Sequence, residues 1–283
     1  MRLICPTAFK GTFSPLEAAR RLAGPGDPLL PLSDGGDGFL ECLQHALGGT
    51  WHSTPAADPF GRIRWVPWLE LADGTACVES AKVVGLAGLD RKDPLLASSR
   101  GLSHLLRLLE GARQIWIGLG GTATVDGGRD WVPLRLPPTV AFCDVTTGLQ
   151  DAARVFGPQK GARPEDIPVL TERLLALGLP SGPRTGCAGG LGARLLALGA
   201  ELQDGAERIL EVCRFDVQAE PCEAVVTGEG RLDASTLEGK LPLVVARRAR
   251  QLGKRVIGHF GSKGDGWELA AAHFDEIRFG LAP

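Results

Sequence analysis

Residues 116–128 read Trp-Ile-Gly-Leu-Gly-Gly-Thr-Ala-Thr-Val-Asp-Gly-Gly, so an apolar strand, expected at Gln114 to Ile117, runs directly into glycines and one carboxylate. Glycine permits positive φ, which lets successive backbone amides point at one anion. The pattern predicts a phosphate-binding loop, and the carboxylate of Asp126 beside it indicates a metal ion. A tight turn between a buried strand and a surface loop is the alternative. The candidate phosphate-binding residues are Gly118, Gly120, Gly121 and Thr122.

Two common nucleotide-binding motifs do not fit the chain. Gly118, Gly120 and Ala123 have the spacing of the dinucleotide fingerprint, but that motif must open a helix. The two glycines after Asp126 and the prolines that follow cannot supply a long helix. Gly239-Lys240 lacks both the glycine five positions earlier and the following Ser or Thr of a Walker A loop. Neither a nicotinamide-dependent oxidoreductase nor a P-loop enzyme is therefore predicted.

The composition indicates a soluble globular protein whose partners are small molecules. With 44% hydrophobic residues, 23% charged residues and a formal net charge of -2, nothing favours nucleic acid or an anionic membrane as partner. The length of 283 residues favours two domains. No apolar run approaches the ~20 residues of a membrane span, and the N-terminus is unlike a signal peptide. We therefore expect a cytoplasmic protein, and a homodimer is one possible assembly.

Cysteine and histidine do not indicate a metal centre. The seven cysteines are scattered singly in apolar contexts, without a Cys-x-x-Cys pair, and are typical of buried thiols in a reducing compartment. The five histidines show no close ligand spacing, so zinc is not predicted.

Polar residues follow two early strands. Lys10 lies in the loop between a short N-terminal strand and a helix, where α/β proteins hold ligands, and a cation there suits phosphate or carboxylate. A second strand, Leu29 to Leu32, ends in Ser-Asp-Gly-Gly-Asp-Gly at residues 33–38. Asp34 and Asp37 are enough to orient a hydrated Mg²⁺ or a substrate hydroxyl. Capping of the next helix by either carboxylate is the alternative.

Three further loops carry candidate residues. Asp144 closes a strand expected from Val140, and Lys160 lies in a loop before a helix expected from Pro164. Gly189 and Gly190 precede a helix expected from Ala193 to Leu198, and amides at a helix start attract anions. Close packing against a neighbouring segment is the alternative for these glycines.

The C-terminal region predicts a doubly wound unit. A strand from Glu223 to Thr227, a charged loop at residues 228–233, a helix from Leu241 and a strand from Arg255 follow in order. Ligands of such units sit at the carboxyl ends of the strands. The loop residues Glu229, Arg231 and Asp233 are therefore candidates for a site. The chain changes character near residue 50, where we expect a domain boundary.

Taken together, these segments resemble the class I glycerate kinase family along nearly the whole chain and in the family's order. The matching blocks are Phe9–Thr12, Pro31–Gly38, Ile117–Gly128, Cys143–Thr146, Ala153–Ala162, Ala188–Gly192 and Thr227–Asp233. The resemblance implies ATP-dependent, Mg²⁺-assisted phosphorylation of D-glycerate, usually to 2-phosphoglycerate. It also implies two α/β domains. A Rossmann-like (flavodoxin-like) domain would comprise residues 1–50 and 222–283, with residues 51–221 inserted as the second domain and an active-site cleft between the two.

The candidate residues divide into four roles in this hypothesis. Cations would hold the glycerate carboxylate or transition-state charge, and carboxylates would bind Mg²⁺, act as general base or orient the glycerate hydroxyls. The catalytic candidates are Lys10, Asp34, Asp126 and Arg231, and the substrate-binding candidates are Ser33, Asp37, Lys160, Glu229 and Asp233. The phosphate-binding candidates are Gly118, Gly120, Gly121, Thr122, Gly189 and Gly190, and the metal candidates are Asp126 and Asp144.

Several positions depart from the family pattern and keep other functions open. The family usually has Asp-Ser at Thr7-Ala8, Glu at Asp37, Thr at Phe39 and Asn at Val125, and its chains are longer. A kinase for another small hydroxy acid is one alternative, because Phe39 could narrow the pocket. A catalytically weak ligand-binding paralogue is another. Magnesium-dependent ATP turnover and a substrate panel separate these possibilities.

Overall fold

The protein is described by a computed structural model that covers residues 1–281, and the chain divides into two compact units. Unit 1 consists of Met1–Gly48 and Ala206–Pro283, and unit 2 consists of Gly49–Gly205. The second division falls at Gly205, whereas we expected it at residue 221. The segment between these points belongs to unit 1, where Glu207 pairs with Arg247 at 3.5 Å and Asp216 pairs with Arg248.

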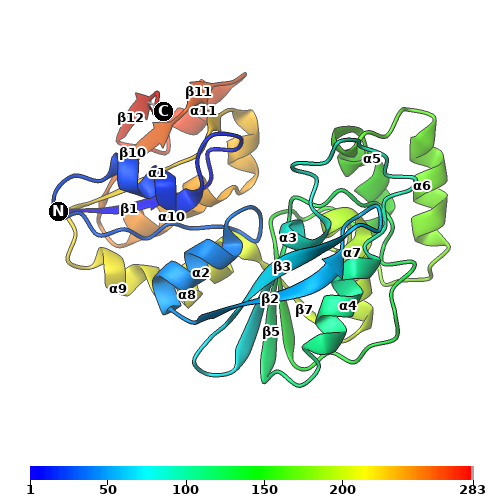
Figure 1. Cartoon of the computed structure of the whole chain (residues 1–283). Helices are drawn as coiled ribbons and strands as arrows, with labels where there is room; N and C mark the ends of the chain where they lie inside the picture. Colours follow the sequence, from blue (N-terminus) through cyan, green and yellow to red (C-terminus); the bar gives the residue numbers. More distant parts are fainter. Residues whose placement is uncertain (282–283) are drawn as a thin grey trace. The chain divides into compact units, whose positions relative to one another are not determined.

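Unit 1 is built on a four-stranded parallel sheet with the order β1-β8-β10-β12. Its strands are β1 (Arg2–Pro6), β8 (Ala224–Gly228), β10 (Arg255–Phe260) and β12 (Glu276–Phe279). Figure 1 shows the blue first strand in the same unit as the orange and red strands from the end of the chain. Ile4, Val226 and Ile257 pair in register and belong to one buried apolar cluster. Burial of such residues stabilises the parallel sheet.

Six short helices and a small two-stranded sheet complete unit 1. The first helix begins where Ser14 Oγ accepts from Glu17 N at 3.3 Å and Glu17 accepts from Ser14 N at 2.8 Å, a reciprocal capping box. The strand expected at Leu29 to Leu32 is only an isolated bridge between Leu29 and Ile4. The helices are α1 (Pro15–Leu22), α2 (Phe39–Leu47), α8 (Gly205–Val212), α9 (Phe215–Ala219), α10 (Leu241–Gln251) and α11 (Trp267–Ala271), with the 3-10 turn η3 (Ala234–Glu238), and the small sheet pairs β9 (Arg231–Leu232) with β11 (Ser262–Lys263).

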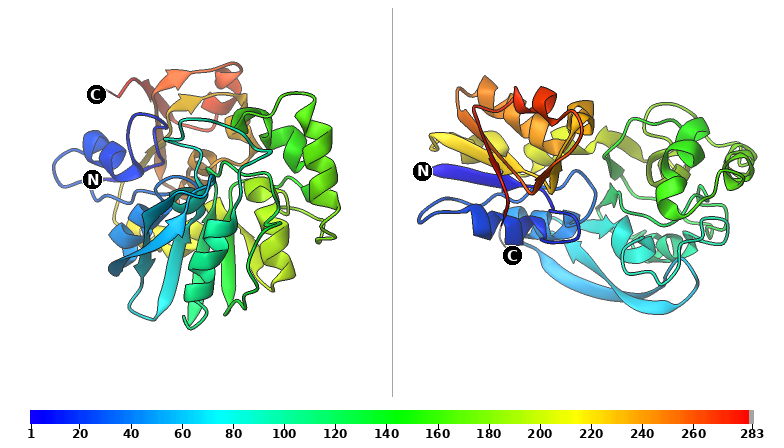
Figure 2. Two further views of the ribbon diagram at one scale, coloured as in Figure 1. Left: turned by 45° about the vertical axis from the view of Figure 1, so that its right-hand side comes forward. Right: turned by 90° about the horizontal axis from the view of Figure 1, so that it is seen from above.

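Unit 2 is built on a six-stranded mixed sheet with the order β2-β3-β4-β5-β6-β7. The strands β4 to β7 are parallel, whereas β2, β3 and β4 pair antiparallel. The light-blue and cyan β2–β3 hairpin is long and curved (Figure 2). The strands are β2 (Thr50–Ala57), β3 (Ile63–Glu70), β4 (Thr75–Glu79), β5 (Gln114–Leu119), β6 (Thr139–Cys143) and β7 (Glu201–Asp204).

The helices of unit 2 enclose two apolar clusters. The larger cluster joins the sheet residues Val78 and Ile117 to Leu106 and Leu191. The smaller one contains Val125, so the glycine-rich loop after β5 is anchored in a core of its own. The helices are α3 (Ser80–Val84), α4 (Arg100–Leu108), α5 (Ala152–Phe156), α6 (Asp166–Leu175) and α7 (Cys187–Ala197), with the 3-10 turns η1 (Leu149–Asp151) and η2 (Pro158–Lys160).

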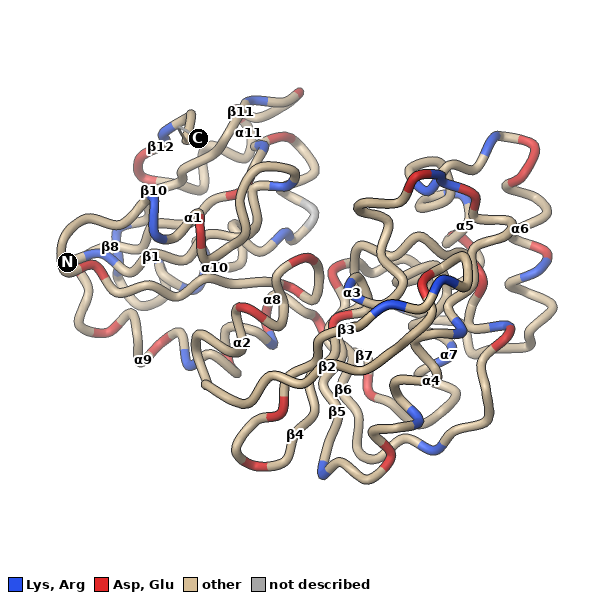
Figure 3. The backbone as a smooth tube through the Cα atoms, in the orientation of Figure 1, with Lys and Arg blue, Asp and Glu red and all other residues tan. Residues whose placement is uncertain are grey.

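The predicted mixed α/β class is confirmed by these sheets and their helices. Both basic and acidic residues are spread over each of the two units, as Figure 3 shows. Within residues 1–281, no helix is both long enough and apolar enough to cross a membrane.

Candidate functional site: two charged loops

The predicted anion nest at residues 118–121 is only partly present. The strand β5 extends to Leu119, and Gly118 pairs with Glu79 on one side and Phe142 on the other. The prediction that Gly118 lies in the loop is therefore wrong, because pairing with β4 and β6 on both sides continues the strand through this glycine. Gly120 is buried, and its carbonyl accepts from Ser80 Oγ at 3.2 Å.

The next residues pair with the segment after α3. Leu86 N donates to the Gly121 carbonyl at 2.8 Å, and Ala123 N donates to the Val84 carbonyl at 2.8 Å. Gly121 has φ 64, the left-handed conformation that favours glycine. The amide of Ala123 is therefore used within the protein, and Thr122 presents its side chain to Lys160.

Lys160 is the buried cation of unit 2. It ends η2 with only 4% of its surface exposed, and its Nζ donates to Thr122 Oγ1 at 3.1 Å and to the Thr124 carbonyl at 2.8 Å. Burial lowers the pKa of Lys160 to about 8, although the charges of Asp126 and Asp144 oppose this effect. The ammonium thus joins two segments of the chain and fixes the path of the glycine-rich loop.

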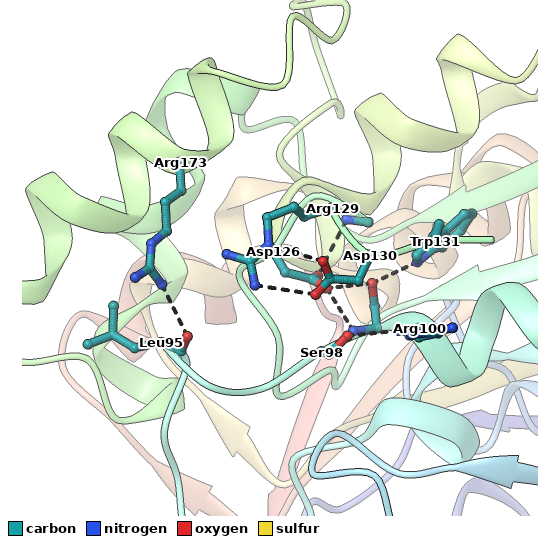
Figure 4. Close-up of polar contacts among 10 residues, drawn as sticks. Leu95, Ser98, Arg100, Asp126, Arg129, Asp130, Trp131 and Arg173 are labelled. Atoms are coloured by element: carbon teal, nitrogen blue, oxygen red, sulfur yellow. Dashed lines mark hydrogen bonds and ion pairs between the residues drawn. The ribbon is translucent and has the colours of Figure 1, made fainter. Parts of the chain in front are cut away.

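Asp126 is buried and accepts several hydrogen bonds (Figure 4). Its Oδ2 accepts from Ser99 N at 2.7 Å and Ser99 Oγ at 2.8 Å, and its Oδ1 accepts from Gly128 N at 3.4 Å. Trp131 Nε1 donates to the same Ser99 hydroxyl at 2.7 Å. Burial raises the pKa of Asp126, while the hydrogen bonds from Ser99 oppose the rise. The carboxylate therefore ties the loop to the start of α4, at residue 100.

Ser99 and Trp131 were missed by the sequence analysis. Ser98-Ser99 before an apolar helical segment was the only available signal, since serines there are typical of a helix start. Nothing local indicates that Ser99 would face a carboxylate 27 residues along the chain.

Gly189 and Gly190 lie in a left-handed kink inside the segment assigned to α7, and a second helical segment follows them. Ala188, Gly189 and Gly190 have φ of 53, 71 and 93 inside the segment assigned to α7. A Cβ on Gly189 would lie 2.0 Å from the Thr124 carbonyl oxygen, and Gly127 N donates to the Gly189 carbonyl at 3.1 Å. The prediction that these glycines precede a helical segment is confirmed, close packing is seen as well, and their phosphate-binding role stays a prediction.

Asp144 follows β6 and is exposed. Cys187 Sγ donates to its Oδ1 at 3.5 Å. Within residues 1–281, no three His, Cys, Asp or Glu side chains form a group able to hold a metal ion by themselves. Mg²⁺ is commonly held by one or two carboxylates together with substrate phosphates, and an exposed carboxylate at a strand end fits that donor set. Asp126 fits it less well, because it already accepts three hydrogen bonds.

In unit 1, the loops after β1 and β8 lie side by side. Thr7 N donates to the Gly228 carbonyl at 2.9 Å, and a Cβ on Gly230 would lie 3.3 Å from Lys10 N. Lys10 itself is exposed. The structure therefore brings this predicted cation to the carboxyl end of the parallel sheet, beside the charged loop at residues 228–233.

The acidic loop at residues 33–38 contributes one carboxylate to the carboxyl end of this parallel sheet. Asp34 is half-buried, and its charge acts on Glu229. Ser33 is buried, and its Oγ donates to the Gly36 carbonyl at 3.1 Å. Asp37 is exposed, and α2 begins after Gly38 without a side-chain cap.

Glu229 and Asp233 form the acidic part of the charged loop. Thr236 Oγ1 donates to Glu229 Oε1 at 3.0 Å, and Lys240 Nζ lies 3.7 Å from Glu229 Oε2. Burial raises the pKa of Glu229, and the carboxylates of Asp34 and Asp233 raise it further, whereas Lys240 opposes the rise. A partly buried carboxylate with a raised pKa is a better proton acceptor than an exposed one.

Asp233 also caps η3, because its side chain accepts from Ser235 N at 3.0 Å. Hydrogen bonding from the Ser235 hydroxyl lowers the pKa of Asp233. Arg231 lies 3.5 Å from Asp233 and keeps 59% of its side chain exposed. Lys240 Nζ lies 3.7 Å from Asp233 Oδ1, and its sequence context, a Gly-Lys pair outside any Walker A motif, does not indicate this contact.

Two of the departures from the family pattern lie in cores. Phe39 is fully buried in unit 1, and Val125 is 1% exposed within the smaller apolar cluster of unit 2. Thr7 Oγ1 donates to the Gly228 carbonyl at 3.2 Å. In this structure the substituted side chains are therefore used for packing and for joining loops.

The glycerate kinase family matches residues 2–132 and 136–279. This chain belongs to that family. It is 33% identical to a glycerate kinase of Halalkalibacterium halodurans, over 99% of this chain and 90% of that protein. It is 33% identical to the glycerate 2-kinase of Escherichia coli, over 93% of this chain and 85% of that protein. A crystal structure of a protein assigned as glycerate kinase 2 from Salmonella typhimurium superposes with a TM-score of 0.77 at 29% identity, over 98% of this chain and 89% of that one.

The family membership confirms the resemblance stated from the sequence and identifies the chain as a kinase. Its two charged loops belong to two different units. The candidates that unit 1 brings together are Lys10, Asp34, Glu229, Arg231 and Asp233, and those that unit 2 brings together are Thr122, Asp126, Asp144, Lys160 and Gly189.

Proposed function

We propose that this kinase transfers the γ-phosphoryl group of ATP to D-glycerate, giving ADP and 2-phosphoglycerate. The observation that carries the proposal is the family match over nearly the whole chain, with relatives named as glycerate kinases matched over 85–90% of their own length. In the reaction, a glycerate hydroxyl oxygen forms a bond to the γ-phosphorus while the bond to the ADP oxygen breaks, and the hydroxyl proton passes to a base.

Unit 1 offers the groups that glycerate requires. Glycerate carries one carboxylate and two hydroxyls, so it needs a cation and hydrogen-bond acceptors. Lys10 and Arg231 are exposed cations at the carboxyl end of the sheet, and Arg231 can form a bidentate pair with a carboxylate. Glu229 and Asp34 are half-buried carboxylates close enough to affect each other. We assign Glu229 as the acceptor of the hydroxyl proton, because of its raised pKa.

Unit 2 offers the groups that the nucleotide phosphates require. Lys160 and Thr122 fix the loop after β5 from inside the unit, and Asp144 lies exposed at the end of β6. Asp144 would hold Mg²⁺ together with the phosphates, and the bound ion would supply positive charge to the transferred group. We assign Asp126 to the geometry of this loop in addition to its predicted catalytic role, because Ser99 and Gly128 donate to its carboxylate.

The test is ADP release coupled to NADH oxidation, with ATP and Mg²⁺ and with D-glycerate, L-glycerate, other hydroxy acids or no acceptor. The proposal predicts turnover that requires D-glycerate and stops when EDTA removes the metal. Proton-coupled ³¹P spectra identify the product, since phosphate on the C2 methine gives a doublet and phosphate on the C3 methylene gives a triplet. Turnover with another hydroxy acid alone would contradict the assignment of D-glycerate.

A further inference from the structure

Lys240 lies between the two carboxylates of the charged loop in unit 1. Its Nζ is 3.7 Å from Glu229 Oε2 and 3.7 Å from Asp233 Oδ1, and 37% of its side chain is exposed. The backbone leaves little freedom in its position, because Gly239 ends η3 with φ 92 and Lys240 is the residue that precedes the first turn of α10. The Lys240 ammonium therefore lies close to two carboxylates, those of Glu229 and Asp233.

The charges that face Glu229 are mostly of its own sign. Asp34 and Asp233 are carboxylates, and burial adds to the cost of a negative charge at this position. Arg231 is directed to Asp233, 3.5 Å away. Thr236 donates a neutral hydrogen bond to Glu229 at 3.0 Å, so Lys240 is the cation that acts directly on this carboxylate.

We propose that Lys240 is a positioning residue of the phosphoryl-transfer site, which holds Glu229 ionised and oriented between Thr236 and Asp233. The inference rests on the proposed function, in which Glu229 accepts the hydroxyl proton. Lys240 itself need not touch glycerate or ATP. A base must be deprotonated to act, so the neighbour that stabilises its charge sets the lowest pH at which the enzyme works.

Replacing Lys240 by Met removes the charge and keeps an unbranched side chain of similar length. Glu229 then faces burial and two carboxylates without a compensating cation, so its pKa rises. An opposite charge at this separation changes a carboxyl pKa by about one unit or more. We expect the acidic limb of kcat/KM against pH to move upward by about one pH unit, with most of the activity recovered above that limb. Lys240→Arg, which keeps the charge, should restore the limb.

The matched control is Lys254→Met. Lys254 is also in unit 1, and its Nζ donates to the Glu220 carbonyl at 2.7 Å, away from the charged loop. Its profile should coincide with that of the unchanged protein. An unmoved acidic limb in Lys240→Met, or an activity loss that is equal at every pH, would overturn the proposal.

A second measurement needs no turnover. The carboxyl ¹³C shift of Glu229, assigned by comparison with Glu229→Gln, reports its protonation in the unchanged protein and in Lys240→Met. A pKa raised by about one unit supports the inference, and an unchanged pKa overturns it. If the unchanged protein fails to turn over D-glycerate while this shift is seen, the proposed function fails and the electrostatic role of Lys240 stands.

Discussion

The two units of this kinase use the charges of their candidate site residues differently. In unit 2, Lys160 and Asp126 are 4% and 9% exposed and are bound to hydroxyl and backbone groups of their own unit. In unit 1, Arg231 and Lys240 keep 59% and 37% of their side chains exposed and lie 3.5–3.7 Å from carboxylates. Buried charges with several partners hold a loop in shape, whereas half-exposed charges remain able to meet a ligand.

The largest effect should come from the glycine that lets the loop of unit 2 pack. Gly189→Ala places a Cβ 2.0 Å from the Thr124 oxygen at φ 71, so we expect a loss of about 4 kcal/mol or more in unfolding free energy. Gly199→Ala is the control, because it has φ 88 with nothing within 4 Å and should cost about 1–2 kcal/mol. Urea unfolding followed by tryptophan fluorescence reports unit 2, which holds Trp51, Trp65, Trp68, Trp116 and Trp131. Equal losses in the two variants would contradict the packing role.

Asp126→Asn tests whether the buried carboxylate does more than hold its loop. We expect kcat to fall about 100-fold or more, while the unfolding free energy falls by about 1–3 kcal/mol, because the amide cannot accept from both Ser99 and Gly128. Steady-state kinetics and urea unfolding on the same preparation separate the two effects. A variant that keeps most of its kcat would assign Asp126 to the loop structure alone.

The pH dependence of the unfolding free energy should reveal the lowered pKa of buried Lys160. Its pKa is about 8 in the folded protein and near 10.5 when unfolded, so between these values the unfolded chain binds more protons. Stability conferred at this site therefore rises with pH over that window, by up to about 1.4 kcal/mol per pH unit. The unfolding free energy of the unchanged protein minus that of Lys160→Met should rise from pH 8 to pH 10. The sequence contains no tyrosine that would titrate in the same range. A flat difference would show that burial does not lower the pKa of Lys160 in the folded protein.

The smallest effect on stability is expected in the exposed loop of unit 1. Arg231→Gln removes a partly exposed ion pair with Asp233, which contributes about 0.5 kcal/mol or less. The same change should raise KM for D-glycerate about tenfold with little change in KM for ATP, because a bidentate partner of the carboxylate is lost. A large loss of stability would indicate that this arginine supports the loop, as Lys160 does in unit 2.

Local chemistry allowed much of this architecture to be predicted. The helix that starts after Ser14 has a capping box, and the strand from Arg255 to Phe260 is an apolar segment after an amphipathic helix. The charged loop at residues 228–233 follows a buried strand, so the strand-helix-strand order was enough to predict that the loop lies at the carboxyl end of the sheet. These features depend on residues that are neighbours in the chain.

The remaining features depend on residues that meet only in the fold. Gly118 continues β5 because partners stand on both sides of the strand, and neither partner is near it in sequence. Ser99 meets Asp126, and Lys240 meets Glu229, through the packing of separate segments. Sequence patterns gave the types of group that a kinase needs, but they could not say which charges would be buried.

Residues 28–32 hydrogen-bond to one edge of β1, whereas the other edge pairs with β8, Arg2 with Ala224, only once the last quarter of the chain exists. At about 5–20 residues per second, a ribosome takes roughly 10 to 40 seconds to make the intervening segment. Unit 2 is continuous and can fold on the nascent chain during that time. The edge of β1 that pairs with β8 lacks its partner during that time, so the sheet of unit 1 is completed only after unit 2 has been made.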